Sequence, residues 1–147
     1  MAIIRTMPLT IDMLGQTIDA FFKNTVPARN PPGKFYVING DYIGKNTPAG
    51  TLVLFHLHGR IVVHARLQHD WWQQNDDRIR HPKAKRFYIL DVATITVLNN
   101  PLRLSDLPQA WQLKWPRGQF DQRSRTLDDT DEKNFLRSAI GTHPVVG

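Results

Sequence analysis

Cysteine is absent from the sequence, and its absence excludes several kinds of site together. Disulfide frameworks, thiol nucleophiles, zinc ribbons and iron–sulfur clusters all require cysteine. Glutamate is nearly absent, because Glu132 is the only one and the other acidic residues are all aspartate. Apolar runs of the roughly 18 residues that cross a bilayer are also missing. We therefore expect no membrane partner, no secretory signal peptide and a cytoplasmic protein.

The charge of the chain is strongly basic for its length. Its 147 residues include 19 Lys and Arg against 13 Asp and Glu, which gives a net charge of +6. This length favours a single domain over residues 1–147. A basic excess favours polyanionic partners, most often nucleic acid, although a solvated basic surface with no such role has the same composition.

Two segments have the apolar spacing of amphipathic helices. The first covers 10–25, where Thr10 is a suitable N-cap and the prolines from Pro27 onward should prevent further helix. Its apolar stripe consists of Ile11, Leu14, Ile18, Phe21 and Phe22. The second covers 130–140 and should end at Gly141. It should direct inward Phe135, Leu136 and Ile140.

The middle of the chain is rich in β-branched and aromatic residues, which favours strands. We expect strands at 34–39, 51–58, 61–68 and 85–98, with the last ended by Asn99-Asn100-Pro101. The pair Gly59-Arg60 suits a type II′ turn. That turn would place Leu54 opposite Ala65 and His56 opposite Val63, and would put His64 on the other face of the hairpin.

Motifs for metal binding and catalysis are weak. His56 and His58 alternate on one strand, but two imidazoles do not make a metal site, and His64 is expected on the opposite face. Nucleophile elbows, H-E-x-x-H and Gly-rich phosphate loops are missing. We expect no metal, no cofactor and no catalytic residue.

The segment 69–86 combines aromatic and cationic residues between two predicted strands. Trp71-Trp72 precedes a group of cations, namely Arg78, Arg80, Lys83, Lys85 and Arg86. Adjacent aromatic and cationic groups can hold single-stranded or flipped-out nucleotides, because bases expose a π-face and phosphates carry charge. The alternative is that a tryptophan caps the core while the charges are only solvated.

Four stretches together resemble the PUA-like superfamily, with EVE-type and ASCH-like domains as the closest relatives. They are FYVING (35–40), GTLVLFH (50–56), GRIVVHARL (59–67) and FYILDVATITVLNNPLRLSDL (87–107), so the resemblance covers about 34–107. It departs at Thr51, where such domains carry an acidic residue. The G-x-K-x-x-E-x-R motif of ASCH relatives similar to amidohydrolases is missing, which argues against catalysis.

The resemblance implies an α+β fold, a bent PUA-like β-barrel of about five to six strands with flanking helices. It also implies a concave pocket for a base, often a modified one, rotated out of a duplex. By position, the base-pocket candidates are Tyr36, Asn39, Phe55, His56, His58, Trp71 and Trp72. The phosphate-binding candidates are Arg78, Arg80, Lys83, Lys85 and Arg86.

The function expected from these observations is a non-catalytic nucleic-acid-binding module that recognises a base in an aromatic pocket. Two alternatives stay open. One is a small hydrolase of the amidohydrolase type acting on a nucleoside-like substrate, with His56, His58 or His64 as acid and base. The other is a protein-interaction or dimerisation domain whose tryptophans are buried against a partner. The sequence does not distinguish DNA from RNA.

Overall fold

The computed structural model describes residues 2–8, 17–37, 47–69, 73–115, 125–127 and 129–144. Its larger sheet has the order β8 (Arg125–Leu127), β1 (Ala2–Pro8), β3 (Leu52–Leu57), β4 (Arg60–Arg66), β7 (Thr96–Arg103) and β9 (Gly141–Thr142). Its smaller sheet has the order β2 (Lys34–Val37), β6 (Arg86–Ile89) and β5 (Gln73–Gln74). The helical elements are α1 (Ile18–Ala20), the π-helical turn η1 (Phe21–Thr25), α2 (Val26–Ala28), the 3₁₀ turns η2 (Val92–Thr94) and η3 (Leu104–Asp106), α3 (Gln109–Gln112) and α4 (Asp129–Ser138).

The α+β class is confirmed, but the described strands do not close into the expected bent β-barrel, and the PUA-like fold stays a prediction. The described strands form two sheets, and β1 pairs with β3 in parallel while the other strand pairs are antiparallel. The sheets join where β4 ends, because the Gln68 N–H donates to the Ile89 carbonyl at 2.9 Å and the Asp91 N–H donates to the Arg66 carbonyl at 2.8 Å.

The predicted strand 85–98 is wrong as a single element. The Asp91 carboxylate accepts the Ala93 N–H at 3.2 Å and starts η2, which carries the chain from the smaller sheet to the larger one. The following strand β7 then runs past the expected stop at Pro101 to Arg103. Pro101 is tolerated because it lies where the register between β7 and β4 shifts, and a proline is accepted at such an irregularity.

The hairpin of β3 and β4 forms, but its predicted turn and register are wrong. Its two turn residues are His58 and Gly59, both with positive φ (53° and 77°), so Leu57 lies opposite Arg60. This is the backbone that a two-residue type I′ turn requires. The shifted turn pairs Leu54 with His64 and, beyond a bulge, His56 with Ile61. His64 therefore shares a face with Leu54.

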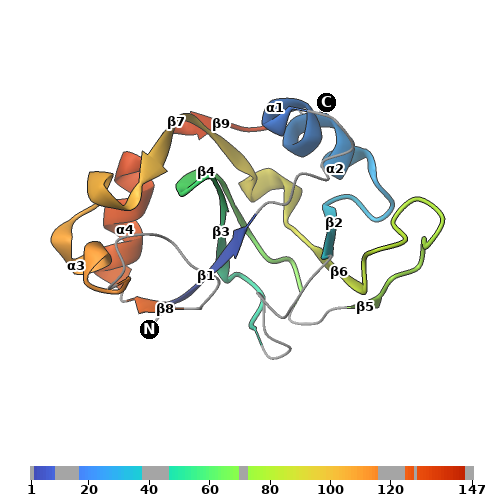
Figure 1. The fold of residues 1–147 in the computed structure, drawn as a ribbon, viewed down its shortest axis with the longest axis horizontal. Coiled ribbons are helices and arrows are strands. Elements are labelled where there is room, and N and C mark those ends of the chain that lie inside the picture. The colour runs from blue at the N-terminus through green and yellow to red at the C-terminus, as the bar shows by residue number, and fades with distance from the viewer. Residues whose placement is uncertain are drawn as a thin grey trace.

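Both faces of this hairpin are buried, against two different apolar clusters. One cluster combines Val53, Phe55, Val63 and Ala65 with rings from the first helical segment and β2, namely Phe21, Phe22 and Phe35. The other combines Leu52, Leu54 and Ile61 with rings from α3, the residues after it, and α4, namely Trp111, Trp115 and Phe135. Figure 1 shows α3 and α4 on one side of β3 and β4, and α1 and α2 on the other.

The first helical segment continues past the expected stop. Its described part runs from Ile18 to Ala28 and includes Pro27, so the prediction that proline ends it is wrong. The wide π turn explains this, because the Val26 N–H already bonds to the Phe21 carbonyl five residues earlier. Thr17, whose hydroxyl accepts the Ala20 N–H at 3.1 Å, caps α1. The expected N-cap and the first two stripe residues, Thr10, Ile11 and Leu14, lie outside the described residues.

The C-terminal helix α4 covers Asp129–Ser138, close to the predicted 130–140. Phe135 is buried as expected, but Ile140 is 69% exposed, so its inward orientation is wrong. Gly141 belongs to β9 and does not act as a helix stop. None of the helices in the described ranges has the length and apolar character that a bilayer crossing needs. The cytoplasmic location stays a prediction.

Candidate nucleic-acid interface

The loop between β5 and β6 is organised by one buried amide, that of Asn75. Its nitrogen donates to the carbonyls of His81 at 2.7 Å and Ala84 at 2.9 Å. Its oxygen accepts the Asp77 N–H at 2.8 Å, and its backbone N–H donates to the Lys85 carbonyl at 3.1 Å. Four hydrogen bonds from one residue fix where the chain turns, so the loop has a defined shape despite having no helix or strand of its own.

Asp77 builds the tip of this loop. Its carboxylate accepts the Arg80 N–H at 3.2 Å, and its carbonyl accepts the His81 N–H at 3.0 Å. This tight turn carries Arg78, Ile79 and Arg80 into solvent, where Ile79 is 95% exposed. The two arginines leave the turn toward two different surfaces.

The first surface is an open hollow of about 340 Å³, here called the basic hollow. Four of the five predicted phosphate-binding residues line it, together with Gln74, Pro82 and Ala84: they are Arg78, Lys83, Lys85 and Arg86. The described residues that line this hollow include no acid. Its surface potential is therefore positive, which favours an anion that can contact several cations at once.

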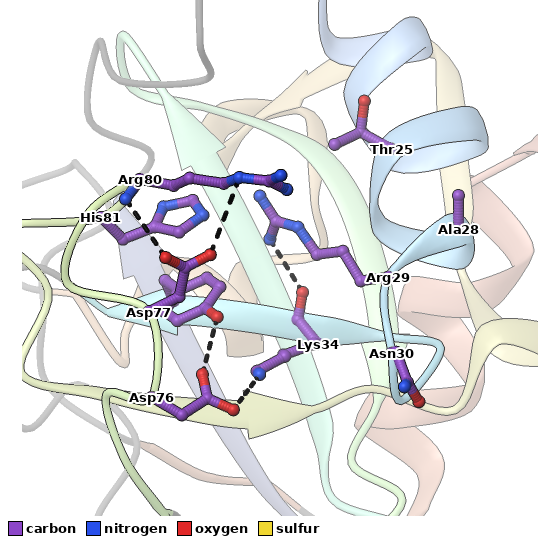
Figure 2. Close-up of a pocket in the computed structure, with 10 residues that line it drawn as sticks. Thr25, Ala28, Arg29, Asn30, Lys34, Asp76, Asp77, Arg80 and His81 are labelled. Atoms are coloured by element: carbon purple, nitrogen blue, oxygen red, sulfur yellow. Dashed lines mark hydrogen bonds and ion pairs between the residues drawn. The ribbon is translucent and has the colours of Figure 1, made fainter.

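The second surface is a cavity of about 570 Å³, here called the Tyr36 cavity. Figure 2 shows three segments meeting around it: the end of the first helical segment, strand β2 and the loop tip. They contribute respectively Thr25, Ala28, Arg29 and Asn30; Lys34 and Tyr36; and Asp76, Asp77, Arg80 and His81. The fifth predicted phosphate-binding residue, Arg80, lies here and does not line the basic hollow.

One wall of the Tyr36 cavity contains an ion pair between a buried lysine, Lys34, and a half-exposed aspartate, Asp76. The Lys34 ammonium is 2.5 Å from the Asp76 carboxylate, which also accepts the Tyr36 hydroxyl at 2.9 Å. Burial acts to lower the pKa of Lys34, but hydrogen bonds with Asp76 and Tyr36 outweigh it and raise the pKa above its usual value. The Lys34 ammonium in turn holds the pKa of Asp76 below its usual range. Both groups are charged near neutral pH and satisfy each other.

The Tyr36 ring is enclosed by cationic and aromatic neighbours. The His81 ring stacks on it with centroids 3.9 Å apart and an interplanar angle of 15°. The Arg29 guanidinium lies 5.2 Å from the Tyr36 centroid and 5.3 Å from that of Phe21, within cation–π range. Burial lowers the pKa of Arg29, with a smaller opposing effect from Tyr36. The ring of Tyr36 therefore holds the cavity wall in place.

Three of the other base-pocket candidates, Phe55, His56 and His58, belong to the described residues and line neither surface. Phe55 has no exposed surface and belongs to an apolar cluster, and His56 is 9% exposed. His58 is exposed at the hairpin turn. Asn39, Trp71 and Trp72 lie outside the described residues. Their roles stay predictions, and Tyr36 is the candidate that lines a cavity.

The three histidines considered for hydrolysis line neither surface. His64 is buried, and this burial lowers its pKa to about 4, although a hydrogen bond with the Ala139 backbone opposes the shift. Glu132 forms an ion pair with Arg66, which ties α4 to β4. Within the described ranges, no three His, Asp or Glu side chains lie close enough to hold a metal ion.

Sequence reasoning missed several residues of the Tyr36 cavity. Arg29 lies in a proline-rich stretch that reads as a linker, and His81 lies within the segment 69–86 but is neither a predicted base-pocket nor a predicted phosphate-binding residue. Lys34 and Asp76 are 42 positions apart, and no local pattern connects them. The one usable signal was a cation, Arg29, a few residues before the predicted strand at 34–39.

Comparisons with family models, with curated proteins and with solved structures give no match for this chain. The PUA-like resemblance therefore stays a prediction, as do the hydrolase and dimerisation alternatives. Function has to be argued from the two surfaces of the loop.

Proposed function

We propose that this protein is a non-catalytic nucleic-acid-binding module that holds the phosphate backbone of a strand in the basic hollow. One observation carries the proposal: Arg78, Lys83, Lys85 and Arg86 line one open surface with no acid among its described lining residues. Phosphodiesters carry one negative charge per nucleotide, so a strand lying along this surface can contact several of these cations.

The rigidity of the loop supports the proposal. Holding four like charges together is unfavourable in the free protein, and Asn75 supplies the hydrogen bonds that oppose their separation. A surface arranged before binding loses less side-chain and loop entropy when the ligand arrives. The cations are also mostly exposed, so binding requires little desolvation of a buried charge.

The finer parts of the proposal concern fold and base recognition. The resemblance of 34–107 to PUA-like domains supports the same function, because the implied module accepts a base beside a phosphate-binding surface. On the basis of that resemblance, we propose that Asn39, Trp71 and Trp72 recognise a modified base. An affinity panel of modified and unmodified oligonucleotides tests this part separately.

The experiment for the basic hollow is a salt titration of oligonucleotide binding by fluorescence anisotropy. Four phosphate contacts predict that log K falls with log[salt] with a slope of about −3 for a single strand and about −3.5 for a duplex. The double variant Lys83→Gln, Lys85→Gln should bind more weakly and reduce the magnitude of the slope by about 1.5, since two contacts are removed.

The matched control removes two exposed cations of α4, Lys133→Gln and Arg137→Gln, and lowers the net charge equally. Its salt slope should stay within about 0.5 of the native value. The proposal is overturned if the native protein binds no oligonucleotide at low salt, or if the α4 variant loses as much affinity as the variant of the hollow.

A further inference from the structure

Two arginines reach the Tyr36 cavity from opposite walls. Arg29 follows α2, and Arg80 belongs to the loop tip. Figure 2 shows the two side chains extending toward each other across the space beneath Thr25. Guanidinium groups repel each other, so an arrangement that directs two of them into one cavity favours an anion between them.

Among the described contacts, neither guanidinium donates a hydrogen bond to a carboxylate, and the single ion pair, between Arg80 and Asp77, is long. Arg29 donates one N–H to the Lys34 carbonyl at 2.9 Å, which leaves four of its five N–H groups for other acceptors. The Nε of Arg80 is 3.9 Å from the Asp77 carboxylate, beyond hydrogen-bond distance, and the side chain is 82% exposed. Most N–H donors of both groups are therefore available to a ligand.

The acids of the cavity are already engaged. Asp76 is bound by Lys34 and Tyr36. The Asp77 carboxylate accepts the backbone N–H of Arg80 and lies 3.9 Å from the Arg80 side chain within its own turn. The lining holds three cations, Arg29, Lys34 and Arg80, against these two carboxylates. The groups free to meet a ligand are thus mainly donors, which selects an acceptor-rich anion.

We propose that the Tyr36 cavity binds a phosphate monoester, held between the guanidinium groups of Arg29 and Arg80. A guanidinium fork binds two oxygens of a phosphate at once, and a monoester offers three such oxygens and close to two negative charges. The cavity volume of about 570 Å³ lies in the range of small-molecule sites and is large enough for a mononucleotide. Burial lowers the pKa of Arg29, an effect that a bound anion would oppose.

The monoester has two sources, a free nucleotide or the terminal phosphate of a strand. The second source rests on the proposed function, because the strand would then continue into the basic hollow. The two surfaces lie on the same loop and share no described lining residue. Their ligands can therefore be tested independently.

The test for the site compares adenosine 5′-monophosphate with adenosine by isothermal titration calorimetry. The native protein should bind the monophosphate and not the nucleoside. Arg80→Gln should weaken this binding about tenfold or more, the effect of losing hydrogen bonds to a charged group. Because Arg80 is highly exposed, this variant tests the site without disturbing the core.

Arg29→Lys keeps the charge and removes the fork, so it should weaken binding less than Arg29→Gln. Lys133→Gln, an exposed change on α4, is the control and should bind the monophosphate as the native protein does. The inference is overturned if the native protein binds nucleoside and monophosphate alike or binds neither. It is also overturned if Arg80→Gln and Arg29→Gln leave monophosphate binding unchanged.

The source of the phosphate is resolved with one oligonucleotide carrying either a 5′-phosphate or a 5′-hydroxyl. If the protein prefers the 5′-phosphorylated oligonucleotide and Arg80→Gln abolishes this preference, the ligand is the end of a strand. If the protein binds the monophosphate but binds both oligonucleotides equally, the ligand is the free nucleotide. Lys83→Gln should weaken both oligonucleotides equally. If the monophosphate binds while neither oligonucleotide does, the proposed function fails and this site stands.

Discussion

Lowering the pH from 8 to 5 should destabilise the fold by about 2 kcal/mol through the imidazole of His64. This side chain lies on β4 opposite Leu54, is 8% exposed, and meets the ring of Phe135 edge-on at 5.7 Å. Burial is the largest cause of its lowered pKa of about 4; the Ala139 backbone opposes the shift, and the charges of Arg66 and His143 add to it.

The sign follows from proton binding in the two states. The folded pKa of about 4 lies below the unfolded value of 6.5, so between these values the unfolded chain binds a proton that the folded chain does not. Stability is therefore complete above pH 6.5 and falls as the pH drops below it. The loss is about 2 kcal/mol at pH 5 and levels off near 3 kcal/mol below pH 4.

Urea denaturation at pH 8, 7, 6 and 5 measures this loss. The variant His64→Gln cannot take up the proton, so its stability should fall about 2 kcal/mol less between pH 8 and 5 than that of the native protein. His58→Asn removes an exposed imidazole at a position of positive φ, which Asn tolerates, and should keep the native pH dependence. An equal loss of stability in native protein and His64→Gln would refute the reasoning, as would an NMR titration placing His64 near 6.5.

Three further predictions concern stability and use urea denaturation at pH 7.5. Gly141→Ala should lower the free energy of unfolding by about 2 kcal/mol, because the added Cβ would lie 2.2 Å from a carbonyl oxygen of β7. The control Gly59→Asn places its Cβ in open space at a positive φ that Asn tolerates, and should change stability by less than about 1 kcal/mol. Asn75→Ala should cost about 2 to 3 kcal/mol by leaving buried carbonyls without donors, and protease should then cut its loop faster than in the native protein. Asp76→Asn should lower the free energy of unfolding by about 2 kcal/mol, because it leaves the buried Lys34 ammonium without its counter-charge. Lys34→Met should lower it by less than about 1 kcal/mol, and equal losses in the two variants would contradict this asymmetry.

The sequence predicted those features that depend on neighbouring residues. The four cations of the basic hollow come from one short segment, so their clustering was visible in the chain itself. The hairpin and the C-terminal helix also follow from local periodicity. The hairpin register did not follow from periodicity, because it depends on His58 adopting a positive φ. Gly59 favours a turn that begins at position 59, and this places the turn one residue too late.

Features that depend on distant residues were not predictable from pattern. Asp91 breaks an apolar stretch that reads as one strand, because its carboxylate caps a turn where the chain changes sheets. The Tyr36 cavity combines the end of a helix and the strand that follows it with a loop that lies 40 positions further along the chain. No periodicity connects Arg29 with Arg80, and only the folded chain places them in one cavity.

The hydrogen bonds of Asn75 fix the backbone of its loop without using the side chains that face a ligand. The partners of the Asn75 side chain are backbone atoms of His81, Ala84 and Asp77, and its backbone N–H donates to the Lys85 carbonyl, so the side chains at 78–80, 82 and 83 contribute nothing to these bonds. These positions can therefore be exchanged: libraries randomised there, with Asn75 and Asp77 retained, should yield variants of unchanged fold whose ligand preference changes with the inserted residues.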